Sequence, residues 1–145
     1  MFQQVQLTSP MLAPVIALVL WTFVMWGWMY YTRIPAIISS KMRLDPNAPR
    51  GQQMNELPAT VRWKADNYNH LFEQPTLFYA VALVLALARD GSNLALGLAW
   101  TYVVLRVVHS VWQATVNVIP IRFYLFSASS VVLFALTLRA AWRVF

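Results

Sequence analysis

The stretch NYNHLFEQPTLFYAVALVLALARDGS, residues 67–92, decides the fold because it joins a polar cluster to an apolar run of membrane length. The run extends from Leu71 to Ala88, and a helix needs about 20 mostly apolar residues to cross roughly 30 Å of hydrocarbon. The turn RDGS then sends the chain back across the membrane. A simple anchor has no use for an asparagine, a histidine and a glutamate followed by a proline. The stretch therefore predicts a spanning helix that also carries a functional site.

The rest of the chain repeats this pattern of long apolar runs. Of its 145 residues, 59% are hydrophobic and 11% are charged, and the mean hydropathy is +0.53. Soluble domains are about 45–50% apolar and about 25% charged. The sequence therefore predicts an all-α integral membrane protein, a bundle of four transmembrane helices that forms a single domain over residues 1–145. The helices are expected over about 11–43, 58–88, 93–116 and 121–143.

The basic residues predict the orientation. Seven of them lie between the first two helices or at the start of the fourth, and three lie at the opposite end: Arg33, Lys41, Arg43, Arg50, Arg62, Lys64 and Arg122 against Arg89, Arg139 and Arg143. Because Lys and Arg accumulate on the cytoplasmic side, the long loop is expected there, with both termini non-cytoplasmic. The net charge of +6 then reflects topology and contact with anionic lipid. A nucleic-acid partner is not expected, since there is no soluble basic face.

Polar residues inside the predicted helices mark a candidate site. The third helix carries a stripe with spacings of four, three, four and four residues, made of Tyr102, Arg106, His109, Gln113 and Asn117. On the second helix, Glu73 shares a face with Asp66 and with Asn69 or His70. An arginine at the membrane centre costs at least about 2.5 kcal/mol, so Glu73 and Arg106 are expected to be counter-charges. The alternative is a purely structural ion pair, with the stripe holding the helices together.

The residue types suit a particular ligand chemistry. Counting along the helices places Glu73 and Arg106 at one level with Arg33 and Arg122, near the cytoplasmic side. Arginine forks bind carboxylates, and a glutamate binds an ammonium group. Glutathione has these groups and a thiol whose ionised form a cation stabilises, so we expect it as the thiol co-substrate. No metal site is expected, because the chain has no cysteine and two histidines without a cluster around them.

Two stretches resemble the MAPEG family, the membrane-associated proteins in eicosanoid and glutathione metabolism. The first, RVVHSVWQATVNVIPIR at 106–122, is similar to the segment that joins helices three and four in microsomal glutathione transferases and microsomal prostaglandin E synthase. The second, NHLFEQP at 69–75, resembles the family's Asn-x-x-Glu motif before a proline. With four helices and a basic loop after the first, the resemblance covers nearly the whole chain.

The resemblance implies a homotrimer that binds glutathione between neighbouring subunits, near the cytoplasmic side, and receives a lipophilic acceptor from the membrane. It implies that Arg122 is the catalytic residue and stabilises the thiolate. The residues implied in glutathione binding are Arg106, Glu73, Asn69, His70, Gln113 and Arg33. His109 is expected to form a packing hydrogen bond between helices rather than to act as a base.

Three positions depart from the family pattern. Gln113 stands where the family often has a tyrosine, and His70 stands where it has an asparagine. The family's arginine one turn earlier is absent, and Asp66 or Ala65 stands in its place. The favoured function is that of a membrane-bound glutathione transferase or glutathione-dependent peroxidase acting on lipophilic electrophiles. The alternative is a non-catalytic MAPEG-like protein that binds lipid or regulates a partner. A small transport subunit fits poorly with charges gathered on one side. The expected location is a bacterial inner membrane, as a multi-pass protein.

Overall fold

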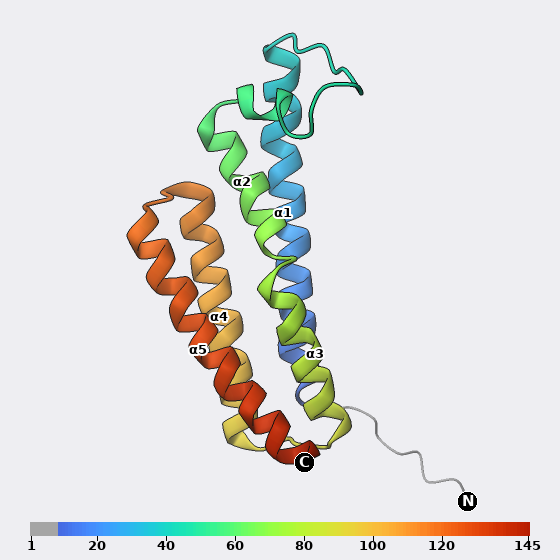
Figure 1. Cartoon of the computed structure of the whole chain (residues 1–145), viewed down its shortest axis with the longest axis vertical. Coiled ribbons are helices and arrows are strands. Elements are labelled where there is room, and N and C mark those ends of the chain that lie inside the picture. Colours follow the sequence, from blue (N-terminus) through green and yellow to red (C-terminus); the bar gives the residue numbers. More distant parts are fainter. Residues whose placement is uncertain (1–8) are drawn as a thin grey trace, which may run out of the picture.

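The computed structural model describes residues 9–145, which form helices and connecting turns with no strand. The elements in chain order are α1 (Leu12–Ser39), the short 3-10 helix η1 (Gln53–Glu56), α2 (Ala59–His70), α3 (Gln74–Leu87), α4 (Asn93–Thr115) and α5 (Ile119–Val144). Figure 1 shows α1 lying beside α2 and α3, with α4 and α5 as a second antiparallel pair. The α1–α2 connection and the α4–α5 turn lie toward one end of the bundle, and the α3–α4 turn and the C-terminus lie at the other.

Four segments are long and apolar enough to cross a membrane. They are Leu12–Ser39, Ala59–Leu87, Asn93–Thr115 and Ile119–Val144, of 28, 29, 23 and 26 residues. The predicted four-span, all-α membrane fold is thereby confirmed for one subunit. At about 1.5 Å per residue, α1 is about 42 Å long, which is longer than the hydrocarbon layer is thick. Figure 1 shows α1 and α2 extending past the α4–α5 turn. The first helix ends at Ser39, earlier than the expected residue 43.

The segment expected as one helix over 58–88 is divided into two. Residues 71–73 separate α2 from α3, and the amides of Phe72 and Glu73 donate to the carbonyls of Asn69 and His70, in a tighter turn than an α-helix. Pro75 explains the break, because it has no N–H for the carbonyl four residues earlier and its ring crowds that carbonyl. The break exposes the C-terminal carbonyls of α2 inside the bundle, at the level of the predicted site.

The main hydrophobic core lies on the α3–α4 side of this break. Phe78 on α3 stacks on Tyr102 of α4, with ring centroids 4.6 Å apart and an interplanar angle of 20°. Ala95 and Ala99 on α4 are fully buried, and such small residues let transmembrane helices approach closely. A second and smaller cluster, made of Met25, Leu71 and Ala114, lies beyond the break. The larger hydrophobic cluster therefore lies away from the end where the polar site lies.

An acidic residue ties the α3–α4 turn to the end of α5. The carboxylate of Asp90 is fully buried, and its Oδ2 accepts hydrogen bonds from the Nε atoms of Arg139, at 2.7 Å, and Arg143, at 3.0 Å. Its Oδ1 accepts from the backbone amide of Ser92 at 3.1 Å. The guanidinium groups of Arg143 and Arg139 hold the pKa of Asp90 well below its usual range. We refer to Asp90, Arg139 and Arg143 as the Asp90 clasp.

Candidate functional site

A cavity of about 240 Å³ opens between α2, α4 and α5, near the α4–α5 turn. Three of the residues predicted for the site, His70, Gln113 and Arg122, line it together. The remaining lining residues are His109, Ile119, Phe123 and Phe126. The α4–α5 turn beside the cavity lies toward the same end of the bundle as the basic α1–α2 connection (Figure 1). The tertiary structure thus brings residues from three helices to one polar hollow among aromatic side chains.

Arg122 enters this cavity from the first turn of α5. Its Nη1 donates a hydrogen bond to the Oδ1 atom of Asn117 at 2.8 Å. Asn117 sits in the α4–α5 turn with a φ of 54°, a left-handed conformation that asparagine tolerates better than most residues. Asn117 was predicted as the last member of the polar stripe, and its role here is to orient the guanidinium of Arg122.

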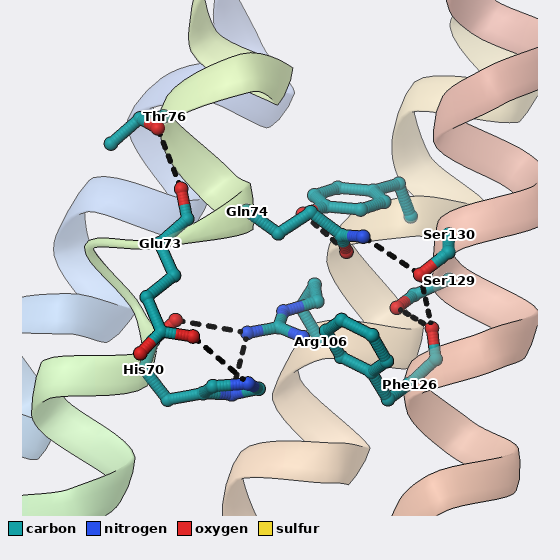
Figure 2. Close-up of polar contacts among 9 residues, drawn as sticks. His70, Glu73, Gln74, Thr76, Arg106, Phe126, Ser129 and Ser130 are labelled. Carbon is teal, nitrogen blue, oxygen red and sulfur yellow. Dashed lines mark hydrogen bonds and ion pairs between the residues drawn. The ribbon is translucent and has the colours of Figure 1, made fainter.

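Arg106 is fully buried and lies at the break between α2 and α3 (Figure 2). Its Nη2 donates to the backbone carbonyl of His70 at 3.3 Å and lies 3.2 Å from the Nδ1 of the same residue. Its guanidinium carbon lies 5.7 Å from the ring centre of Phe126, a cation–π distance. Within residues 9–145, its Nε and Nη1 have no hydrogen-bond partner. Arg106 therefore stabilises the broken helix and still has donors to offer.

Glu73 pairs with His70 and not with Arg106. An Nε2–Oε2 distance of 3.4 Å joins His70 to Glu73, whose side chain is 67% exposed. Because arginine always donates, the Nδ1 of His70 accepts from Arg106, and the ring proton sits on Nε2, toward Glu73. The expected direct pairing of Glu73 with Arg106 is therefore replaced by a relay through His70 (Figure 2). The helix break is the cause, since it turns Glu73 outward.

Of the other predicted binding residues, Arg106 and Glu73 contact the lining residue His70 without lining the cavity themselves. Asn69 and Arg33 do not reach the cavity within this chain. Asn69 is exposed on α2, whereas Asn67 is fully buried and donates a hydrogen bond to Ser110 of α4. Arg33 on α1 contacts the sulfur of Met29 at 3.9 Å and is not among the lining residues. Sequence reasoning missed Asn67, although its position three residues before His70 places both on one helical face.

Aromatic rings form one wall of the cavity. The rings of His70 and His109 stack with centroids 5.1 Å apart, and Phe126 lies 5.4 Å from His70. His109 is 1% exposed and makes no side-chain hydrogen bond within residues 9–145, and its Nδ1 has no partner. Among the described residues 9–145, His109 thus lacks the packing hydrogen bond that was expected of it. The apolar wall residues Ile119, Phe123 and Phe126 gave no signal in the sequence.

Tyr102, the first residue of the stripe, belongs to a separate polar network. Its hydroxyl donates to Oε1 of Gln74 at 3.4 Å, and Nε2 of Gln74 donates to the hydroxyl of Ser130 at 2.7 Å. Figure 2 shows Gln74 reaching across to Ser130 just above Arg106. This network closes the bundle on the core side of the cavity.

Several buried polar atoms in the cavity wall, and on Arg106 next to it, lack hydrogen-bond partners. Within residues 9–145, Arg106 offers two donor nitrogens, and the Oε1 of Gln113 and the Nδ1 of His109 are buried without partners. Buried polar groups are normally satisfied, so the two donors of Arg106 suit an anionic group, and the acceptor Oε1 of Gln113 suits a hydrogen-bond donor. No group of three or more His, Cys, Asp or Glu residues suited to a metal ion occurs in the described part of the chain.

Four helices of spanning length and an inner polar cavity near one end define a small polytopic membrane protein. The chain belongs to the MAPEG family, whose family model matches residues 11–142. The resemblance of the two sequence stretches is thereby confirmed over nearly the whole chain. Membership fits a membrane function related to glutathione in general. No curated protein and no solved structure matches the sequence.

Proposed function

We propose that this protein is a membrane-bound glutathione transferase or glutathione-dependent peroxidase that acts on lipophilic electrophiles. The observation that carries the proposal is the cavity in which Arg122 faces Gln113 and the two stacked histidines. Bound glutathione would supply the thiol. Arg122, held by Asn117, would stabilise the thiolate, because a fixed cation beside a thiol favours its ionised form.

The ends of the tripeptide would be held by Arg106 and Glu73. The free Nε and Nη1 of Arg106 would donate hydrogen bonds to a carboxylate, which guanidinium groups bind strongly. Glu73, whose carboxylate is 67% exposed, would take the ammonium group. His70 would orient both, since it contacts Arg106 on one ring nitrogen and Glu73 on the other. The remaining candidates, Asn69 and Arg33, would act from the rim or across a subunit boundary.

A homotrimer is part of the proposal, and exposed polar residues on α2 and in the turn that follows it support it. Asp66, Asn69 and Glu73 are exposed on one chain, and the contact of His70 with Arg106 puts them at a depth where lipid would be the neighbour. Polar groups at such a depth need protein or water beside them. A second copy would cover this face and enlarge the cavity. Mass measurement in mild detergent should give a trimer, and a stable monomer with full glutathione binding would rule this arrangement out.

A non-catalytic role in lipid binding or partner regulation is the second candidate. Gln113 supports it, because an amide can donate a hydrogen bond to sulfur but cannot give up its proton as a tyrosine hydroxyl can. The bonds of Arg106 to His70 support it too, since they give this buried arginine a structural use. This candidate predicts that any bound glutathione keeps its thiol protonated and forms no thiolate.

Stopped-flow absorbance with glutathione distinguishes the two. Wild type should develop thiolate absorbance near neutral pH and then conjugate glutathione to a lipophilic aryl halide. Arg122→Ala should abolish the absorbance and retain part of the binding. A wild type that binds glutathione without forming thiolate supports the second candidate, and one that does not bind it at all removes glutathione as the ligand.

A further inference from the structure

The Asp90 clasp carries more positive than negative charge. Arg139 and Arg143 share one carboxylate, and each uses only its Nε on Oδ2 of Asp90. Their terminal amino groups make no hydrogen bond within residues 9–145, and the two side chains are 26% and 44% exposed. Arg89, exposed in the same turn, adds a further positive charge. Two guanidinium groups that share one carboxylate, on residues one helical turn apart, present donors that suit a phosphate.

An apolar stripe on α5 leads directly to this end of the bundle. It consists of Val131, Phe134, Leu138 and Trp142, which are 68%, 64%, 55% and 82% exposed. Spacings of three, four and four residues place these side chains on one face. The stripe is about 16 Å long and faces outward, where a membrane protein meets lipid. Trp142, at its end, suits the interface between hydrocarbon and headgroups.

We propose that the Asp90 clasp and the α5 stripe together bind one anionic glycerophospholipid, whose phosphodiester contacts Arg139 and Arg143 and whose acyl chain lies along the stripe. Asp90 fixes the two arginines in place, and their excess charge attracts the headgroup. This site lies by the α3–α4 turn and the C-terminus, at the end of the bundle opposite the α4–α5 turn that borders the cavity (Figure 1). It is independent of the proposed transferase activity, and the two are tested by separate measurements.

Native mass spectrometry of the purified full chain, titrated with phosphatidylglycerol or phosphatidylcholine, tests the proposal. Wild type should retain phosphatidylglycerol preferentially. Arg139→Gln/Arg143→Gln should weaken that retention about tenfold, whereas the matched pair Arg43→Gln/Arg50→Gln, at the other end, should change it much less. Because the first variant leaves Asp90 without its donors, Asp90→Asn/Arg139→Gln/Arg143→Gln serves as a second variant with no stranded charge, and it should show the same loss.

Three results would overturn the site. The first is an unchanged preference for phosphatidylglycerol in the neutral triple variant. The second is an equal loss in the Arg43/Arg50 pair, which would mean general attraction to basic residues. The third is full competition by inorganic phosphate at a concentration equal to that of the lipid, which would mean that a free anion binds and the stripe contributes nothing.

Discussion

Arg106 donates a hydrogen bond to the backbone carbonyl of His70 across 3.3 Å, where α2 ends within the bundle. The bond joins two features that look unrelated in the sequence, a buried arginine on α4 and a proline on α3. Pro75 leaves carbonyls of the preceding turn without their helical donors, and a guanidinium at the negative end of α2 is favourably placed. Arg106 thus has a structural partner and, through Nε and Nη1, capacity for a ligand.

Arg106→Ala and Glu73→Gln should each weaken glutathione binding, because they would remove charge-assisted contacts with its ends. The expected loss is about 1.5–3 kcal/mol per contact, measured by calorimetry. Arg106→Ala should also lower the melting temperature in detergent, since it leaves the carbonyl of His70 without its side-chain donor, whereas Glu73→Gln should leave the melting temperature nearly unchanged. Arg50→Ala, in the α1–α2 loop, is the control. Full affinity in both variants would contradict the assignment.

Asn117→Gly tests whether Asn117 positions Arg122. Glycine accepts the positive φ without strain, so the substitution removes the amide contact and preserves the turn. A lost hydrogen bond of about 0.5–1.5 kcal/mol should raise the pKa of bound thiol by up to about one unit, with binding largely retained. Titration of thiolate absorbance against pH measures the shift. A residue that serves only the turn would leave the thiol pKa where it is in wild type.

Gln113→Tyr should raise turnover if the cavity holds a working thiol site. The hydroxyl would lie in the cavity wall that already contains Arg122 and the stacked histidines. It can both donate a hydrogen bond to sulfur and give up its proton, whereas the amide Nε2 of Gln113 can only donate. Gln113→Phe, which adds the ring without the hydroxyl, is the matched control. An equal rise in both variants would assign the effect to ring packing.

Asp90 should make the melting temperature of the protein depend on pH in the acid range. Its folded pKa is depressed by Arg143 and Arg139, so its contribution is complete above the unfolded pKa of about 4 and is lost as the pH falls toward the folded value. The melting temperature of wild type should therefore fall steeply below about pH 4. Asp90→Asn should lower the melting temperature at pH 7 and flatten this acid dependence. Identical pH profiles for the two proteins would show that the clasp contributes nothing to stability.

The orientation of the chain is tested by labelling. The chain has no cysteine, so Asn47→Cys and Ser92→Cys each create a single reactive site. The basic loop around Asn47 is expected in the cytoplasm, and the two sites lie in connections at opposite ends of the bundle (Figure 1). An impermeant thiol reagent should label Ser92→Cys in intact cells and Asn47→Cys only after the membrane is opened. The reverse pattern would invert the topology.

The sequence by itself determined the spans, the family and the presence of buried charge. Hydropathy and helical period are local properties, so four apolar runs and the stripe of α4 could be predicted without coordinates. The same period placed Arg106, His109 and Gln113 on one buried face. The family motifs added Arg122, which the structure places in the same cavity as Gln113 and His70.

Only the tertiary structure decided which polar groups meet. The sequence predicted one helix over 58–88, and the break at Pro75, with the direction in which the chain turns there, depended on the contacts available across the bundle. That turn directed the carbonyl of His70 to Arg106 and left Glu73 outward. The packing of neighbouring helices likewise decided which side chains came within hydrogen-bond distance. It buried Asn67 rather than Asn69 against α4, and it made Asp90 the partner of Arg139 and Arg143. Spacing along one helix cannot encode such contacts, because they depend on how separate helices pack against one another.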